Sequence, residues 1–277
     1  MTNSSMNNLK FSVSMCVYGG DNANHFREAL ESVYNQTLLP DEVVLVVDGP
    51  VPPSIDKVIQ EYSDAHETFR VFRLKENQGH GNARRLGFSK CSYDYIAIAD
   101  ADDINAKRRF EIELGYFEKA PSLGAVNSSC YHFTGDISHI LNEEKVPLTD
   151  AEIKEFMKKR CPIVQPSVML NKAAVLKAGG YLDWYHGEDY YLWVRMYLTG
   201  ATFAGINESL VYMRTDPEQM NRRGGMKYFR SMEQLFRYML KNHVIGIGLY
   251  LYNSLGRFVM QVLMPNKLRA WVRKKFL

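Results

Sequence analysis

The first half of the chain alternates between short apolar runs and longer segments whose apolar residues recur at helical spacing. The runs that predict β-strands are residues 11–17, 43–47, 70–74 and 95–99. The segments that predict helices are residues 25–36, 54–63 and 81–90, the second with Ser54 as its expected N-cap. Strands joined by helices of this length favour a parallel sheet with right-handed crossovers, so the pattern predicts an α/β fold.

The second half of the chain has a less regular pattern. Its candidate strands are residues 125–129, 160–170 and 201–206, and its candidate helices are residues 150–160 and 188–198. No internal repeat or low-complexity linker separates the two halves. We therefore expect one continuous domain, with a mostly parallel central sheet flanked by helices, and a helical extension at the C-terminus.

Composition and charge exclude several classes of protein. Of the 277 residues, 46% are hydrophobic and 23% are charged, which is typical of a globular protein. The net charge of +3 is too small to indicate a nucleic-acid partner. Four widely spaced cysteines without a C-x-x-C pair argue against a zinc or dithiol site. The polar N-terminus has no apolar signal core, so we expect a cytosolic protein.

Three carboxylates, Asp100, Asp102 and Asp103, follow the fourth predicted strand. Ligands of open parallel sheets bind beyond the carboxyl ends of the strands. Carboxylates crowded there repel each other unless a cation holds them, and Mg²⁺ is commonly bound by one or two carboxylates together with substrate phosphates. The cluster therefore predicts a metal–diphosphate site. The alternative is an N-cap on a helix over residues 104–117, which suits Asp103 but does not explain Asp100 and Asp102 together.

Five sequence blocks resemble, in order and spacing, those of family 2 glycosyltransferases, which have the GT-A (Rossmann-like) fold. The blocks are VSMCVYGG…LESVYNQT (13–37), VVLVVDGP (43–50), NQGHGNARRLG (77–87), ADADD (99–103) and GEDYYLWVR (187–195). They are most similar to those of bacterial enzymes that build O-antigen or capsule repeat units on a lipid carrier.

This resemblance implies a division of the chain. Residues 1–215 form the GT-A domain, with a nucleotide-binding half over about 10–103 and an acceptor half over about 104–215. A mobile loop and a helix follow at 216–240, and a membrane-associating segment at 241–277.

The resemblance also implies roles in the donor site. Tyr18 lies where the family packs a residue on the nucleotide base. Asp48 matches the acid that bonds the uracil imide, although Val47 replaces the acid that normally precedes it. Asp102 matches the D-x-D acid that ligates Mn²⁺ or Mg²⁺, and Asp100 lies near both ribose and metal. The implied nucleotide-sugar ligands in these blocks are Val17, Tyr18, Asp48, Asn77, Arg84, Asp100 and Ala101.

Single residues of these blocks have simpler explanations. Tyr18 alone is more often ordinary packing, and an isolated Arg84 on a helix is usually a solvated cation. Gly79 and Gly81 resemble the start of a dinucleotide fingerprint, but Arg84 replaces its third glycine and the stretch precedes the fourth strand rather than following the first. The stretch therefore argues against a Rossmann dehydrogenase.

A second acidic group, Glu188-Asp189, opens a predicted helix. Acids at a helix N-terminus are stabilised by the macrodipole whatever their function. Sugar transfer, however, needs a base that takes the proton of the acceptor hydroxyl. The resemblance assigns that role in an inverting reaction to this pair, and we expect Asp189 to be the base, with Glu188 as the alternative. Trp184 and His186 are candidates for the acceptor site, although a lone tryptophan is as often part of a core.

Residues 213–225 are expected to form a polar, mobile loop that closes over the diphosphate in the resembling family. Relatives often carry a histidine there, and this loop has none. The loop instead offers arginines to bind phosphate oxygens, because guanidinium groups match them in geometry: Arg214, Arg222 and Arg223. A solvated basic loop is the alternative.

The apolar segment 243–264 has the length of a membrane span, but Asn253, Arg257 and Gln261 fall on one of its faces. We expect an amphipathic helix lying at the cytoplasmic face of the inner membrane, held also by the cationic residues after Pro265. The alternative is a helix packed on the catalytic domain.

The sequence therefore favours an inverting, Mn²⁺- or Mg²⁺-dependent enzyme. We expect it to transfer a hexose or N-acetylhexosamine, with galactose preferred, from a UDP-sugar to a polyprenyl-diphosphate-linked saccharide. The donor candidates are UDP-galactose, UDP-glucose and UDP-GlcNAc. The alternatives are a non-catalytic nucleotide-sugar-binding protein and a metal-dependent sugar-phosphate phosphatase. In the phosphatases, however, D-x-D follows the first strand.

Overall fold

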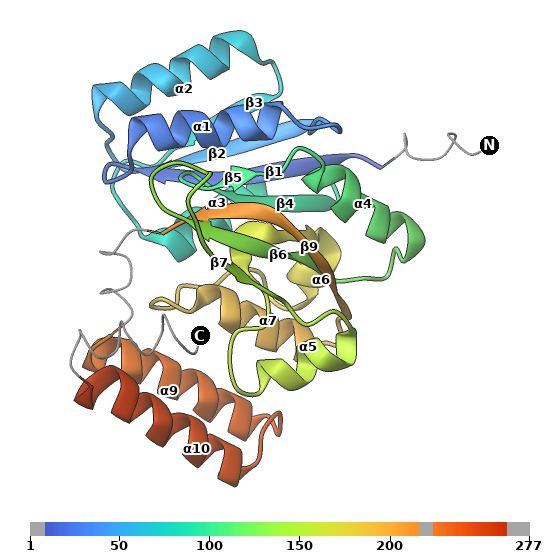
Figure 1. Ribbon diagram of the computed structural model, residues 1–277, viewed down its shortest axis with the longest axis vertical. Helices are drawn as coiled ribbons and strands as arrows, with labels where there is room; N and C mark the ends of the chain where they lie inside the picture. The colour runs from blue at the N-terminus through green and yellow to red at the C-terminus, as the bar shows by residue number, and fades with distance from the viewer. Residues whose placement is uncertain (1–8, 216–223, 265–277) are drawn as a thin grey trace.

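The computed structural model describes residues 9–215 and 224–264, in which a nine-stranded sheet is covered by helices on both faces (Figure 1). The strands are β1 (Phe11–Tyr18), β2 (Glu42–Asp48), β3 (Phe69–Arg73), β4 (Tyr95–Asp100), β5 (Ile104–Asn105), β6 (Ala125–Phe133), β7 (Ile140–Glu144), β8 (Val168–Asn171) and β9 (Phe203–Arg214). The α/β fold predicted from the sequence is confirmed.

The sheet joins a parallel half to a mixed half. Its strand order is β3-β2-β1-β4-β8-β6-β9-β5, and β7 pairs with β6 beside this path. Strands β3, β2, β1 and β4 are parallel because helices cross over between them. Strand β8 is antiparallel to both β4 and β6, whereas β6 and β9 are parallel. The two halves of the chain therefore share one continuous sheet.

The helices separate into two layers (Figure 1). One face of the sheet is covered by α1 (Ala23–Tyr34), α2 (Pro53–Ala65) and α4 (Arg109–Lys119). The other is covered by α3 (His80–Lys90), α5 (Asp150–Met157), α6 (Lys172–Lys177), α7 (Glu188–Leu198) and α9 (Met226–Lys241). A 3₁₀ turn, Gln165–Ser167, precedes β8. Helix α10 (Ile247–Phe258) packs on α9 and continues as a π-helical turn, Val259–Leu263.

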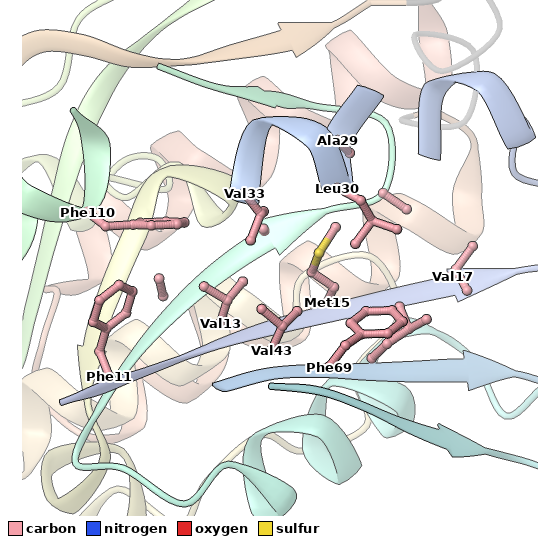
Figure 2. Packing of buried hydrophobic residues seen from close by; sticks show 14 of the residues in the cluster. Phe11, Val13, Met15, Val17, Ala29, Leu30, Val33, Val43, Phe69 and Phe110 are labelled. Carbon is pink, nitrogen blue, oxygen red and sulfur yellow. The ribbon is translucent and has the colours of Figure 1, made fainter. Parts of the chain in front are cut away.

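Alternation along β1 explains how one strand serves both layers. Phe11, Val13, Met15 and Val17 are buried in the same cluster as Leu30 of α1 (Figure 2). The residues between them point to the opposite face, because successive side chains of a strand alternate. Every residue of β2 is buried, as its unbroken apolar run predicts.

Two predicted helix caps are wrong. Helix α2 begins at Pro53, and Ser54 lies in its first turn rather than at its cap. Proline is well suited to the start of a helix because its φ angle is already helical. Residues 104–105 form β5 and α4 begins only at Arg109, so Asp103 caps no helix.

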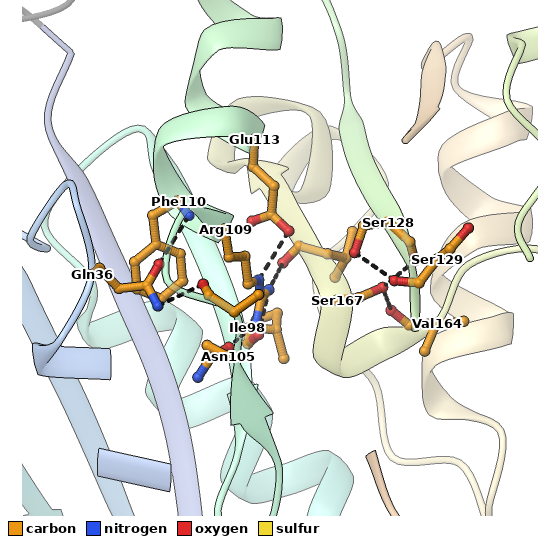
Figure 3. A network of polar contacts seen from close by, with 12 residues as sticks. Gln36, Ile98, Asn105, Arg109, Phe110, Glu113, Ser128, Ser129, Val164 and Ser167 are labelled. Carbon is orange, nitrogen blue, oxygen red and sulfur yellow. Dashed lines mark hydrogen bonds and ion pairs between the residues drawn. The ribbon is translucent and has the colours of Figure 1, made fainter. Parts of the chain in front are cut away.

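A buried guanidinium ties α4 to the centre of the sheet (Figure 3). Arg109 donates hydrogen bonds to the carbonyls of Ile98 on β4, at 2.9 Å, and of Val168 on β8, at 3.3 Å. It also bonds Asn105 and forms a fully buried ion pair with Glu113 at 2.9 Å. Arg109 therefore fixes β4 against its antiparallel neighbour just before the aspartate cluster.

Helix α10 turns its polar side toward the protein and its apolar side outward. Asn253 Nδ2 donates to the carbonyl of Lys158 at 2.9 Å, and the Arg257 guanidinium lies 5.1 Å from the ring centroid of Phe236. The outward stripe has residues four apart that are 48–64% exposed: Ile247, Leu251, Leu255, Val259 and Leu263. Within the described residues, no helix has the length and hydropathy required to span a bilayer.

Candidate active site

Parallel pairing brings the ends of β1, β2 and β4 to one edge of the sheet. Tyr18 lies opposite Asp48 in the β1–β2 register, and Asp100 lies opposite Cys16 in the β1–β4 register. Tyr18 is 37% exposed, whereas Asp48 is buried. The side chain of Val17 is buried in the core, so only its backbone can meet a ligand. The predicted convergence of these strand ends is therefore present.

The carboxylate of Asp48 holds the loop that precedes α3. Its Oδ1 accepts from the backbone N–H of Gln78 at 2.7 Å, and its Oδ2 accepts from that of Gly79 at 3.1 Å. Gly49 has φ 85°, and a Cβ there would lie 2.6 Å from the backbone nitrogen of Asn77, so only glycine fits. Each carboxylate oxygen of Asp48 retains a second lone pair with which it can accept a ligand's N–H.

Arg84 is buried inside the site rather than solvated, with 1% of its side chain exposed. One of its terminal nitrogens donates to the carbonyls of Ser14 and Ala99, at 3.1 and 3.3 Å. The other forms an ion pair with Asp100. Helix α3 thus reaches Asp48 through its preceding loop and Asp100 through Arg84. Asn77 and Ala101 lie beside these contacts, the first exposed and the second buried.

The other two acids of the cluster are fixed by Arg214, the last residue of β9. Its backbone N–H donates to Asp103 Oδ1 at 2.8 Å, and its Nε donates to the Asp102 carbonyl at 3.1 Å. Burial, together with the nearby charge of Asp102, raises the pKa of Asp103 well above its ordinary value, although Arg214 opposes the shift. Asp103 therefore holds its proton to a higher pH than an exposed aspartate does.

Asp100 and Asp102 are the two carboxylates of the cluster that could hold a hard divalent cation. Asp102 is half-buried, and the carboxylate of Asp100 is 28% exposed beside Arg84. Mn²⁺ or Mg²⁺ would be held by the oxygens of these two residues, because both ions prefer carboxylate ligands.

A different group, Cys130, His132 and Glu144, brings its ligand atoms within 4.8 Å of one another on β6 and β7. Its His132 Nε2 already bonds Glu144 at 2.9 Å, and burial raises the pKa of the Cys130 thiol. These softer donors do not suit the ions expected at a diphosphate site.

The acid pair begins α7 beside the start of α3. Glu188 Oε1 lies 2.7 Å from Nδ1 of His80, the first residue of α3. Asp189 is half-buried, its Oδ1 accepts from the backbone N–H of Tyr190 at 2.6 Å, and its Oδ2 lies 3.9 Å from the Cys161 sulfur. Helix α3 therefore contacts Asp100 through Arg84 and Glu188 through His80.

Burial alone would raise the pKa of Glu188, which is only 7% exposed. The hydrogen bond with His80 is the largest of the effects that outweigh burial, so the pKa of Glu188 lies below its ordinary value. Glu188 is therefore ionised at neutral pH, and a lowered pKa makes it a weaker base.

The two candidate acceptor residues lie in the segment before α7. Trp184 packs on Tyr191, with ring centroids 4.2 Å apart, and its buried Nε1 has no hydrogen-bond partner among the described residues. His186 is exposed, has a left-handed φ of 51°, and lies edge-on to Tyr185 and Tyr228. Both side chains are near the acid pair in sequence, and their contact with an acceptor stays a prediction.

One residue of the site was not predicted from the sequence, and a second was expected in a different kind of element. His80 belongs to the NQGHGNARRLG block, but its position is not fixed by the family pattern. Arg214 was expected in a polar loop, whereas β9 extends to it through pairing with β6. Arg222 and Arg223 lie outside the described residues.

The sequence is similar to a family model and to several known proteins. Residues 12–179 match the family model described as glycosyl transferase family 2. A UDP-Gal:α-D-GlcNAc-diphosphoundecaprenol β-1,3-galactosyltransferase of Escherichia coli is 33% identical over 96% of each chain. An uncharacterized glycosyltransferase of Haemophilus influenzae is 32% identical over 97% of this chain and 99% of its own. The amylovoran biosynthesis glycosyltransferase AmsE of Erwinia amylovora is 29% identical over 96% and 98%.

The fold is also similar to solved structures. Residues 1–349 of S. aureus TarS, crystallised in complex with UDP-GlcNAc, align with a TM-score of 0.67 and 14% identity. The alignment covers 96% of this chain and 79% of the TarS chain.

Proposed function

The chain belongs to glycosyl transferase family 2, and from this premise we propose that it moves a hexose or N-acetylhexosamine from a UDP-sugar to a lipid-diphosphate-linked saccharide, with inversion. Galactose is the preferred sugar, because the E. coli relative is named as a galactosyltransferase that acts on GlcNAc-diphosphoundecaprenol. One observation carries the proposal. Helix α3 contacts Asp48 through its preceding loop, Asp100 through Arg84 and Glu188 through His80, so donor-side and acceptor-side carboxylates share one scaffold.

In the proposed reaction, Asp189 accepts the proton of the acceptor hydroxyl. The hydroxyl oxygen forms a bond to the anomeric carbon while the bond from that carbon to the UDP oxygen breaks, and UDP departs with the electron pair. Bound at Asp100 and Asp102, Mn²⁺ or Mg²⁺ would neutralise the charge that develops on the diphosphate. Glu188 remains ionised beside the base, since its pKa is lowered.

The other residues complete the proposed binding sites. Tyr18 offers an exposed ring at the sheet edge on which a nucleotide base can stack. Arg222 and Arg223 are proposed to bind diphosphate oxygens, and Trp184 and His186 to contact the acceptor sugar.

The exposed apolar side of helix α10 supports the proposal that the acceptor is a membrane lipid. Its outward apolar stripe matches a helix lying at the lipid interface, and exposed apolar patches commonly mark such surfaces. The sequence that follows adds positive charge suited to anionic lipids: Lys267, Arg269, Arg273, Lys274 and Lys275. We therefore place the enzyme at the cytoplasmic face of the inner membrane, in the synthesis of O-antigen or capsule polysaccharide.

The proposal is tested with purified protein, a panel of UDP-sugars and GlcNAc-diphosphoundecaprenol. We expect mass spectrometry to detect one added hexose or N-acetylhexosamine, largest with UDP-galactose, and lost in EDTA. Asp189→Asn should lower turnover by roughly 10²- to 10⁴-fold, the usual contribution of a general base. Asp64→Asn, at an exposed acid on α2, is the matched control and should keep full activity.

Three results would contradict the proposal. UDP binding without transfer to any lipid acceptor would indicate a binding protein. Phosphate release from sugar phosphates would indicate a phosphatase. Full activity in EDTA and in Asp102→Ala would exclude the metal role.

A further inference from the structure

His80 lies between the two halves of the site with both ring nitrogens engaged. Its Nδ1 is 2.7 Å from Glu188 Oε1, and its Nε2 accepts from Nε of Arg84 at 3.3 Å. Because the arginine Nε always carries a proton, Nε2 of the imidazole must be the unprotonated nitrogen. The proton of the neutral ring is then on Nδ1, which donates to the carboxylate of Glu188. These contacts select a single neutral tautomer.

This histidine completes a chain of contacts across the site. Arg84 pairs with Asp100 on the donor side, and Glu188 is the neighbour of the proposed base on the acceptor side. Glu188 is 108 residues from His80 in sequence, and the backbones approach closely where they meet, since a Cβ on Gly81 would lie 3.5 Å from Glu188 Cβ. The imidazole is thus the polar link between α3 and α7.

We propose that His80 is a positioning residue, which in its Nδ1–H tautomer holds Glu188 in place and thereby sets the acid pair against the donor site. The role rests on the proposed function, since it concerns the same transfer reaction. The charged and titratable groups facing Glu188 are His80 and Arg84 from α3, its neighbour Asp189, and the Tyr181 hydroxyl. Of these, His80 is the group that donates a side-chain hydrogen bond to Glu188 within the described residues.

The tautomer can be measured without any substrate. Protein labelled with ¹⁵N-histidine gives long-range ¹H–¹⁵N correlations that distinguish Nδ1–H from Nε2–H imidazole, and the His80 signals are those lost in His80→Asn. We expect the Nδ1–H pattern at neutral pH in the wild type. We expect Glu188→Gln, which weakens the acceptor, to change that pattern. An Nε2–H or doubly protonated ring in the wild type overturns the proposal.

Kinetics then separate positioning from substrate contact. We expect His80→Ala to lower kcat by roughly 10- to 100-fold, the scale of a misplaced reacting group, with little change in KM or in the Kd for UDP. His80→Asn should recover most of the loss, because the asparagine amide can donate from a place close to that of Nδ1. Arg85→Ala, exposed on the same helix, is the control and should leave kcat unchanged.

A double-mutant cycle gives the decisive comparison. If His80 acts through Glu188, His80→Ala adds little to the loss already caused by Glu188→Gln. Losses that multiply, or a loss confined to KM, would instead mean that His80 contacts the substrate and would overturn the positioning role. If the wild type transfers no sugar, the proposed function fails, and the NMR result still decides whether the link between α3 and α7 exists.

Discussion

Glu113 on α4 carries a carboxyl group that is fully buried in the protein interior, away from water. Its Oε1 pairs with Arg109, but its Oε2 has no hydrogen-bond partner among the described residues. Burial raises the pKa of Glu113 from 4.5 to about 7, against the opposing charge of Arg109. The folded protein therefore keeps a proton there at pH values where the unfolded chain has released it.

This shift predicts how stability depends on pH. Because the folded pKa is the higher one, the free energy of unfolding contributed by Glu113 is full below pH 4.5 and falls as the pH rises toward about 7. We expect Glu113→Gln to remove that slope, so that the difference between wild type and variant changes by roughly 1–3 kcal/mol from pH 5 to pH 7.5. Urea unfolding at several pH values measures it. Parallel curves for the two proteins would contradict the shift, and Glu67→Gln at an exposed site is the control.

At the same scale, the sequence predicted residues at strand ends better than residues that act through another side chain. Asp48 and Asp100 could be placed because parallel strands end at one edge. The contacts of His80 and Arg214 could not be predicted, because their partners, Glu188 and Asp103, are 108 and 111 residues away in sequence. A local pattern carries no information on such contacts.

Helix α10 shows the same limit for a whole element. The pattern of residues 243–264 predicted an amphipathic helix, but amphipathicity does not say which side meets the protein. Asn253 bonds the Lys158 carbonyl, so the polar side is inward and the apolar stripe is exposed. The orientation of α10 therefore depends on tertiary contacts of its polar residues, such as Asn253 and Arg257.

We expect the stripe on α10 to bind anionic lipid. Leu251→Asp with Leu255→Asp should lower cosedimentation with phosphatidylglycerol vesicles by at least about tenfold, because each leucine buried in the interface contributes about 1.5–3 kcal/mol. Turnover on a water-soluble acceptor should be unchanged, since the stripe lies outside the site. Leu176→Asp on α6, also an exposed leucine, is the control. Equal binding by all three proteins would exclude α10 as the membrane surface.

For the molecule as a whole, the parallel direction of β1, β2, β3 and β4 was predictable because a helix joins each of these strands to the next along the chain. The antiparallel insertion of β8 between β4 and β6 was not, because strand order there depends on pairing between distant segments. The family resemblance supplied the fold class where the pattern of the second half was too irregular.

Ligand binding gives a prediction for the whole molecule. UDP with Mn²⁺ should raise the free energy of unfolding by about 2.7 kcal/mol at a concentration 100 times Kd, because only the folded state assembles the site. UDP with EDTA should raise it less, and Asp102→Ala should abolish the difference between the two conditions. Thermal unfolding followed by fluorescence measures each shift. Identical shifts with and without metal in the wild type would argue against a cation at the aspartate cluster.

The position of α3 has a consequence for protein engineering. This helix is encoded in the first third of the chain, yet its N-terminal residue bonds the start of α7 and its Gly81 lies against Leu182 and Asp183. Chimaeras that take α3 from one parent and α7 from another would join surfaces that did not evolve together. Exchanging substrate specificity between relatives should therefore succeed when α3 and α7 are taken from the same parent. A crossover placed between the two helices should give a hybrid that folds but has no transferase activity.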